Sequence, residues 1–205
     1  MALTLHHLKQ SRSRRLVWLV AELGADVDVV SYDRNPETGL APEDLQAAHP
    51  LGKAPVLTGD DGLKLAESGA IAQYLLARFD GGHHLHPRED DADFPRYLEW
   101  MHAAEGSPFL PGLIAFYLQK FDLSDSPLAA YMESERAKAV AHVERHLGQH
   151  AYFAGGSFTA ADCMMGFMLD MVAASGALDS LPAIKGWHAR IADRPGYQAM
   201  LQVGG

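Results

Sequence analysis

Two hydrophobic periods alternate through residues 1–80, and each change of period indicates a new element. Residues 2–8 alternate leucine with polar side chains, which is typical of a half-buried strand. In the next segment apolar residues recur at helical spacing and stop at Gly24, a residue suited to a helix C-terminus. Glycines and aspartates at residues 59–62 indicate a hairpin turn. The pattern predicts strand, helix, strand, helix, strand, strand and helix at residues 2–8, 13–23, 27–32, 42–48, 54–58, 63–66 and 68–79.

The pattern changes after Phe79. Residues 80–92 contain glycine, proline and many charges, a composition typical of a linker. Beyond them the apolar residues recur at helical spacing, without a convincing strand. Thr159 and Asp162 have the spacing of a capping box, which predicts the start of a helix. The predicted helices cover residues 94–121 with an interruption near Pro108 and Pro111, residues 127–149, the apolar run 163–172 after the capping box, and residues 182–191.

This order of elements predicts two domains of different class. The first is an α/β domain with the order β-α-β-α-β-β-α, and the second is an all-α helical bundle. We expect the α/β domain to comprise residues 1–80, the linker residues 81–92 and the helical domain residues 93–205. A chain of 205 residues with 48% hydrophobic side chains is long enough to bury a core in each.

Composition narrows the class of function. The formal net charge of −9 argues against a general nucleic-acid-binding protein. No apolar run approaches the roughly 18 residues that a membrane span needs, and no apolar run precedes the basic cluster near the N-terminus, so we expect neither membrane insertion nor secretion. Cys163 is the single cysteine, which excludes a disulfide within the chain. We therefore expect a cytoplasmic protein.

Residues 49–57 read His-Pro-Leu-Gly-Lys-Ala-Pro-Val-Leu, and Pro55 stands at the start of a predicted strand. A trans proline there would remove a hydrogen bond from the strand ladder. A cis Ala54–Pro55 bond costs only about 0.5–1 kcal/mol and would turn the backbone N–H and C=O of Ala54 toward a ligand. A trans proline that opens an edge strand fits the sequence equally well, so both isomers stay open.

A second segment begins shortly after the hairpin, with Glu67 and Ser68 at the start of a predicted helix. Ser68 is a suitable N-cap, and the backbone N–H groups at a helix start bind anions. Glu67 beside it can pair with an ammonium group. The two residues would suit a ligand that carries an α-amino acid end, although plain helix capping is an equally simple explanation.

The sequence His-Pro-Leu-Gly-Lys-Ala-Pro-Val-Leu, followed by Glu-Ser-Gly-Ala-Ile, resembles the glutathione-binding half of cytosolic glutathione transferases. The resemblance extends over nearly the whole chain and includes the helix cap at residues 158–162. It implies a thioredoxin-like first domain that binds glutathione. It also implies a Ser, Tyr or Cys after the first strand, where this chain reads Gln-Ser-Arg-Ser-Arg-Arg at residues 10–15, so the chain is similar to serine-type members of theta-like and bacterial enzymes.

The resemblance implies a role for each of several residues. Ser11, at the turn from strand to helix, would stabilise the glutathione thiolate, with Ser13 as the alternative if it does not cap the first helix. The Ala54–Pro55 segment would contact the cysteinyl part through the backbone, and Glu67 with Ser68 would hold the γ-glutamyl end. The glycyl carboxylate would be held by one of three basic side chains: Lys53, His49 or Arg12.

The implied activity is attack of the glutathione thiolate on a small hydrophobic electrophile, in a homodimer and without a metal. Glutathione-dependent reduction or isomerisation, and a non-catalytic regulatory or interaction role, are the alternatives. No thiol lies at residues 10–15, which disfavours a mixed-disulfide mechanism. His142, His146 and His150 share one helix face, which we interpret as solvated, and Cys163 as a buried apolar residue. Some aromatic residues of the long helix should face the electrophile, with the candidates being Trp100, Met101, Phe109, Phe116 and Tyr117.

Overall fold

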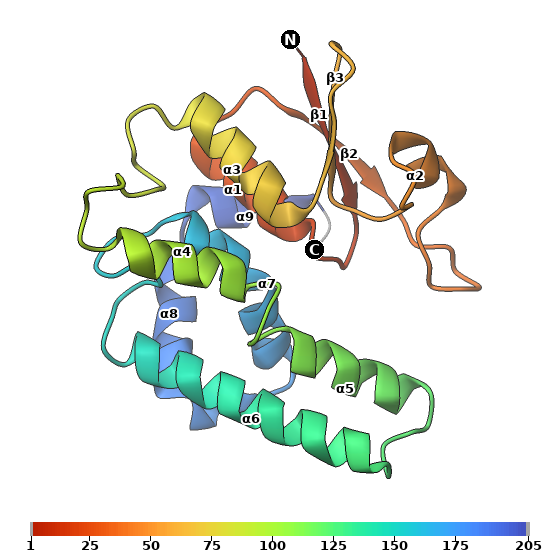
Figure 1. Cartoon of the computed structure of the whole chain (residues 1–205), viewed down its shortest axis with the longest axis vertical. Coiled ribbons are helices and arrows are strands. Elements are labelled where there is room, and N and C mark those ends of the chain that lie inside the picture. The colour runs from red at the N-terminus through yellow and green to blue at the C-terminus, as the bar shows by residue number, and fades with distance from the viewer. Residues whose placement is uncertain (1, 204–205) are drawn as a thin grey trace. The chain divides into compact units, whose positions relative to one another are not determined.

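The computed structural model describes residues 2–203, which form two compact units (Figure 1). One unit combines the chain up to residue 88 with the segment from residue 189 onward, and the other comprises residues 89–188. The strands and helices of residues 2–80 follow the order predicted from the sequence. The elements of the first unit are β1 (Leu3–Leu8), α1 (Arg14–Leu23), β2 (Asp28–Tyr32), α2 (Glu43–Ala48), β3 (Val56–Gly59), β4 (Lys64–Ala66), α3 (Ser68–Phe79) and α9 (Pro195–Gln202).

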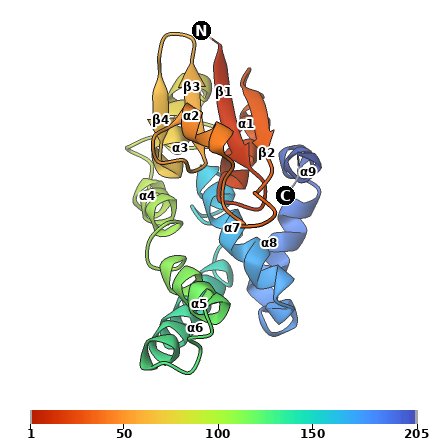
Figure 2. The same cartoon turned by 90° about the vertical axis from the view of Figure 1, so that its right-hand side faces the viewer.

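The first unit is built on a four-stranded mixed sheet in the order β2-β1-β3-β4 (Figure 2). Strand β1 pairs in parallel with β2 and antiparallel with β3, and β3 forms the predicted hairpin with β4. In the register, His6 lies opposite Val56, and Val56 lies opposite Ala66. The leucines of β1 that alternate with polar residues are buried, because that face of the strand carries the core.

Helix α1 packs against both α3 and α9. It ends at Gly24, whose φ of 56° lies in the left-handed region that glycine adopts without strain. The rings of Trp18 and Tyr197 meet edge to face, with 4.9 Å between centroids. Arg194 donates hydrogen bonds to the Glu22 carboxylate at 2.9 and 2.7 Å. These contacts tie the C-terminal segment to the sheet unit, although the sequence analysis placed it in the helical domain and did not predict α9.

The second unit is all-helical. The helix predicted over residues 94–121 is interrupted as expected, and Pro111 lies in the first turn of its second part, where a missing N–H costs little. Cys163 is fully buried, as predicted, in a helix whose first seven residues are all buried. The elements of this unit are α4 (Phe94–Ala103), α5 (Leu110–Lys120), α6 (Pro127–Leu147), α7 (Ala160–Ala174), a 3₁₀ turn (Ala177–Ser180) and the start of α8 (Pro182–Ala192).

Asp162 connects three segments of the helical unit through one buried carboxylate. It accepts hydrogen bonds from the N–H of Thr159 at 2.9 Å, the N–H of Phe153 at 3.2 Å and the indole of Trp187 at 2.8 Å. The predicted capping box of Thr159 and Asp162 is therefore present. Burial raises the pKa of Asp162 to about 6, while the surrounding hydrogen-bond donors act to lower it.

We predict that Asp162→Asn lowers the free energy of unfolding by about 2–4 kcal/mol, because the amide NH₂ would face two donors and leave both without an acceptor. Urea denaturation measures the difference. The matched control is Asp179→Asn, which removes an exposed ion pair with Lys185 and should leave the free energy of unfolding nearly unchanged. Equal effects of the two substitutions would show that Asp162 does not hold the helical unit together.

Candidate functional site

The turn that joins β1 to α1 contains the two serines predicted to contact a ligand. Gln10 in this turn has a φ of 53°, an uncommon conformation for a residue with a side chain. Arg34 donates hydrogen bonds to the carbonyl oxygens of Gln10 at 2.9 Å and of Gly39 at 3.0 Å. The turn is thereby attached to the loop that follows β2.

Ser13 is completely buried. Its Oγ lies 2.7 Å from Nδ1 of His7 and accepts the N–H of Leu8 at 3.1 Å. The same hydroxyl lies 3.2 Å from the carbonyl oxygen of Leu8. Ser13 occupies the N-cap position of α1, but its side chain makes no capping hydrogen bond. Ser13 is therefore the N-cap of α1 by position, as the sequence analysis considered, but its hydroxyl turns toward β1 and does not bond to the helix N–H groups.

Ser11 is the partly exposed serine of the pair. Its Oγ lies 2.8 Å from the Oγ of Ser13 and accepts the N–H of Ser13 at 3.3 Å. When Nδ1 of His7 carries the proton, His7 can donate to Ser13. The single hydroxyl hydrogen of Ser13 has two acceptors within reach, the carbonyl oxygen of Leu8 and the Oγ of Ser11, and we consider the arrangement in which it goes to Ser11. In that arrangement the hydrogen of the Ser11 hydroxyl is available to a ligand.

Sequence reasoning did not identify His7 as part of this site. Its position in the first strand was visible in the sequence, but a histidine at such a position does not by itself indicate a functional role. Its contact with Ser13 depends on how the turn folds back over the end of β1, which no local pattern shows.

The Ala54–Pro55 peptide bond is cis, which is one of the two isomers that the sequence left open. Pro55 is buried, and Ala54 lies just before the first paired residue of β3. Lys53, one residue earlier, is exposed. His49 is half-buried, and its Nδ1 accepts the N–H of Leu51 at 3.3 Å.

Glu67 is the N-cap of α3, and its φ of 71° makes a sharp corner between β4 and the helix. The prediction that Ser68 is the N-cap is wrong. Ser68 is already the first helical residue and is buried, whereas the Glu67 side chain is exposed. The Glu67 side chain makes no capping hydrogen bond, and the first N–H groups of α3 have no carbonyl partner within the helix.

The sheet register brings these segments to the same end of the sheet. Val56 pairs with Ala66, so Pro55 and Glu67 each follow directly beyond that pair. Val56 also pairs with His6, so β1 continues past the same point toward the turn of Ser11. Arg12, in that turn, is partly exposed. The turn of Ser11, Pro55 and Glu67 therefore lie at the same end of the sheet.

The comparison with known proteins now identifies the family. The model of the glutathione S-transferase N-terminal domain matches residues 1–77, and the model of the C-terminal domain matches residues 107–195. The chain belongs to the glutathione S-transferase family. Its fold is the fold of that family, with a thioredoxin-like first domain and an all-helical second domain.

Individual glutathione S-transferases match over nearly the full chain. Glutathione S-transferase 3 of Schizosaccharomyces pombe is 33% identical, over 94% of this chain and 84% of that protein. The crystal structure of a glutathione S-transferase from Actinobacillus pleuropneumoniae is 38% identical with a TM-score of 0.88, over 99% of this chain and 94% of that chain. A sphingomonad glutathione S-transferase complexed with glutathione is 26% identical with a TM-score of 0.80, over 97% of each chain. These relatives support glutathione transferase function, so the chain is an enzyme.

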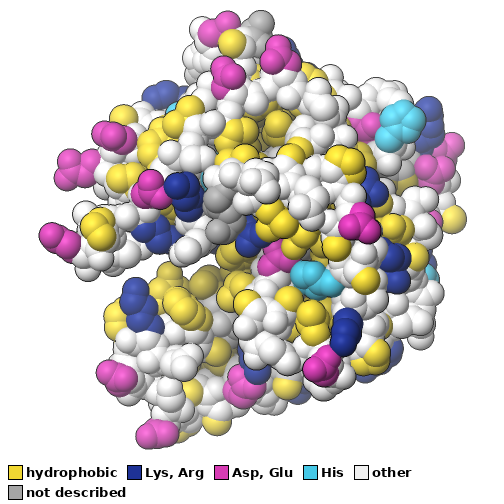
Figure 3. Space-filling model, turned by 180° about the vertical axis from the view of Figure 1, so that it is seen from behind, with side chains coloured by type: hydrophobic (Ala, Val, Ile, Leu, Met, Phe, Trp, Pro, Cys, Tyr) yellow, Lys and Arg dark blue, Asp and Glu magenta, His cyan; other side chains and the backbone are white. Residues whose placement is uncertain are grey.

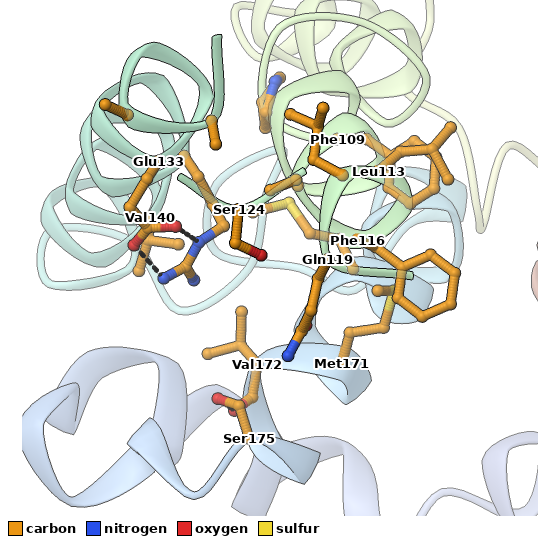
Figure 4. A pocket seen from close by; sticks show the side chains of 18 of the residues that line it. Phe109, Leu113, Phe116, Gln119, Ser124, Glu133, Val140, Met171, Val172 and Ser175 are labelled. Carbon is orange, nitrogen blue, oxygen red and sulfur yellow. Dashed lines mark hydrogen bonds and ion pairs between the residues drawn. The ribbon is translucent and has the colours of Figure 1, made fainter. Parts of the chain in front are cut away.

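The helical unit of this transferase separates the aromatic candidates into two groups. Trp100 and Met101 are buried, and the Trp100 ring packs against His146 with 4.6 Å between centroids. Phe109 and Phe116 instead line a pocket of about 940 Å³ (Figure 4). The lining of that pocket lies entirely between residues 108 and 177, so the residues predicted to contact glutathione are not part of it.

The histidine face of α6 is solvated only in part, since His142 is exposed, as the sequence analysis expected, whereas His146 is half-buried. His142 stacks on Trp100 with 5.3 Å between ring centroids, and Nε2 of His146 lies 3.0 Å from the carbonyl oxygen of Phe153. Burial is the main cause that lowers the pKa of His146 to about 4. His146 is therefore neutral at pH 7 and belongs to the aromatic packing of the transferase.

Within residues 2–203 no group of three or more His, Cys, Asp and Glu side chains is arranged to hold a metal ion. Over the same residues no helix combines the length and apolar character required to span a bilayer. On the face seen in Figure 3, acidic and basic side chains are interspersed.

Proposed function

We propose that this transferase is a serine-type enzyme in which the Ser11 hydroxyl donates a hydrogen bond to the thiolate of bound glutathione. The observation that carries the proposal is the chain of polar contacts from His7 through Ser13 to Ser11, which ends at a partly exposed hydroxyl. Ser13 is too deeply buried to act in its place. A glutathione complex of the sphingomonad relative supports glutathione as the co-substrate.

The chemistry requires the thiol of glutathione to lose its proton near neutral pH, because the thiolate is the nucleophile. A free thiol has a pKa of about 8.5, and lowering it by about two units takes about 2.7 kcal/mol of preferential thiolate stabilisation. A hydrogen bond to a charged group contributes about 1.5–3 kcal/mol, so one hydroxyl group can provide most of the required thiolate stabilisation. His7 and Ser13 would strengthen this bond by orienting the Ser11 hydroxyl.

The thiolate then attacks an electrophilic carbon of the second substrate, which we propose to be small and hydrophobic. A carbon–sulfur bond forms, and the electron pair displaced from that carbon leaves with the departing group or is protonated by water. The enzyme contributes position and thiolate stabilisation, without a metal. Conjugation of this kind would serve detoxification in the cytoplasm, where the glutathione pool is reduced.

We propose that the rest of glutathione lies along the sheet edge described above. The backbone of Ala54, beside the cis Pro55, would pair with the cysteinyl amide, and Glu67 with the start of α3 at Ser68 would hold the ammonium and carboxylate of the γ-glutamyl end. Lys53 is exposed near this edge and would pair with the glycyl carboxylate, for which His49 and Arg12 are the alternatives. We propose chain limits of residues 1–80 for the glutathione-binding domain, 81–92 for the linker and 93–205 for the helical domain, with the segment from residue 189 onward packing in the first unit.

We also propose a homodimer. Helix α5 carries an apolar stripe that is open to solvent in the single chain, formed by Leu110, Tyr117 and Phe121, whose exposed fractions are 50%, 47% and 63%. These residues recur at helical spacing, and the rings of Tyr117 and Phe121 stack with 6.3 Å between centroids. Exposed apolar patches of this kind mark interaction sites. The partner chain would set the region of its third helix, α3, against this stripe.

We predict that Ser11→Ala raises the pKa of enzyme-bound glutathione and lowers turnover near pH 7 roughly tenfold or more, since it loses a hydrogen bond to a charged group. Glutathione affinity should change little. The thiolate absorbance as a function of pH measures the pKa. The matched control, Ser13→Ala, should act mainly on the free energy of unfolding, by about 1–3 kcal/mol, because it removes buried hydrogen bonds. If Ser13→Ala shifts the pKa more than Ser11→Ala, the wrong serine has been assigned.

We predict that Glu67→Gln weakens glutathione binding by about tenfold, because the amide no longer pairs with the ammonium group of the γ-glutamyl end. Calorimetric titration with glutathione measures the dissociation constant. His84→Ala, an exposed change outside the proposed site, is the control and should leave the constant unchanged. Equal effects of the two changes would remove Glu67 from the site, and no heat at several millimolar glutathione would contradict the whole proposal.

We predict a sedimentation mass of about twice 22.3 kDa at micromolar concentration for the wild-type chain. Tyr117→Glu should shift the mass toward that of one chain, because it places a charge in the apolar stripe of α5. Lys138→Glu, an exposed change on α6, is the control and should remain dimeric. A wild-type mass near 22.3 kDa would be incompatible with the homodimer.

A further inference from the structure

The loop of residues 33–42 connects β2 to α2 (Figure 1) and is closed by its own hydrogen bonds. The N–H of Asn35 donates to the carbonyl oxygen of Leu40 at 2.9 Å, and the N–H of Gly39 donates to the carbonyl oxygen of Asn35 at 2.8 Å. The Asn35 side chain accepts the N–H groups of Glu37 and Thr38 at 2.9 and 3.0 Å. These bonds hold the shape of the loop, so a residue attached to it is attached to a fixed support.

Arg34 lies at the start of this loop and connects it to the turn that contains Ser11. Its side chain is half-buried, and it donates from Nη1 to the carbonyl oxygen of Gly39 at 3.0 Å and from Nη2 to that of Gln10 at 2.9 Å. The guanidinium is planar and keeps its charge at all ordinary pH values. The two charge-assisted bonds therefore hold the Gln10 carbonyl in a fixed position relative to the loop.

The Gln10 carbonyl belongs to the peptide unit that leads into Ser11. A peptide unit is planar, so this oxygen and the Cα of Ser11 lie in one plane. Gln10 has a φ of 53°, which residues with a side chain rarely adopt and which surrounding contacts must maintain. A rotation of this unit would displace the Cα of Ser11 and the hydroxyl with it. Arg34 opposes that rotation by bonding to the oxygen.

Ser11 is held on its other side by the start of α1. Its carbonyl oxygen accepts the N–H of Arg14 at 3.2 Å, and its Oγ accepts the N–H of Ser13 at 3.3 Å. Helix α1 thus fixes the chain after Ser11, and Arg34 fixes the peptide unit before it. Loss of the Arg34 bond would leave the position of the hydroxyl controlled from one side.

An ion pair joins the same two segments in a different way. Nζ of Lys9 lies 2.9 Å from Oδ1 of Asp33, and the exposed fractions of these side chains are 39% and 80%. Exposed pairs of this kind contribute little to stability. This pair joins two side chains, whereas Arg34 bonds to the backbone of the turn. Lys9 is therefore a matched comparison for Arg34, with the same charge and a similar aliphatic stem.

We propose that Arg34 is a positioning residue for the transferase reaction: by bonding to the Gln10 carbonyl, it fixes the direction from which the Ser11 hydroxyl meets the thiolate of glutathione. The inference rests on the proposed role of Ser11 and adds a residue that acts through the backbone, without touching the ligand. It follows that the geometry of Arg34 matters and that its charge alone does not.

Substitution of Arg34 tests the proposal through the thiolate itself. Arg34→Met should raise the pKa of enzyme-bound glutathione by about 0.5, measured from the thiolate absorbance as a function of pH. Turnover at pH values below that pKa should fall about threefold, since the thiolate fraction falls by that factor. The dissociation constant of glutathione should change little. Lys9→Met removes a positive charge from the same pair of segments and should leave the pKa unchanged.

A double-mutant cycle with Ser11→Ala separates an indirect effect from a direct one. If Arg34 acts through Ser11, then Arg34→Met added to Ser11→Ala should raise the pKa no further. A further rise would overturn the proposal, as would equal effects of Arg34→Met and Lys9→Met. An unchanged pKa in Arg34→Met, with a raised pKa in Ser11→Ala, would overturn the role of Arg34 and leave that of Ser11 standing. An unchanged pKa in Ser11→Ala would overturn both.

Circular dichroism checks the fold of each variant. Should Arg34→Met not fold, Arg34→Lys takes its place in the cycle, because it keeps the charge but lacks the planar group that bonds to two carbonyls at once. Its pKa for bound glutathione should also be raised, and a value equal to that of the wild type would count against the proposal.

Discussion

Strand β3 pairs with β1 on one side and with β4 on the other, and the arrangement of the candidate glutathione site follows from these two registers. A slip of one residue in either register would turn every side chain of a strand to the opposite face. His6 supports the register, since its ring lies 2.9 Å from the Tyr32 hydroxyl on β2 and 3.0 Å from the Thr58 hydroxyl on β3. Burial lowers the pKa of His6, so the neutral ring is favoured in this bridge across three strands. The serine turn, the cis proline and the start of α3 then meet at one end.

The two serines of the turn between β1 and α1 differ in burial. Ser13 is buried and has a structural place, whereas Ser11 is partly exposed and can reach a ligand. The Ser13 hydroxyl makes its hydrogen bonds to His7 and to the backbone of Leu8 inside the protein. Ser11 keeps contact with both the interior and the surface. A hydroxyl that is oriented by a buried neighbour loses less freedom when it binds an anion, which is the physical reason for proposing Ser11 as the residue that contacts the thiolate.

Helix α7 contributes to both the core and the pocket of the helical unit. Its N-terminal end is held by Asp162, whose buried carboxylate bonds to the loop before it and to Trp187 of α8. Its later turns present Met168 and Val172 to the pocket between the helices. The same buried helix therefore supplies core side chains of the unit and one wall of that pocket.

The sequence by itself determined the order of the elements in residues 2–80, the interrupted helix near Pro108 and Pro111, the capping box at Asp162 and the family. These features depend on local spacing and on short motifs, which are visible along the chain. Only the tertiary structure decided which proline isomer is present, that Ser13 faces the interior, that Glu67 is the cap of α3, and that α9 packs on α1. Each of these depends on contacts between segments that are distant in sequence or on burial, and hydrophobic periodicity carries no information about which partner a side chain meets.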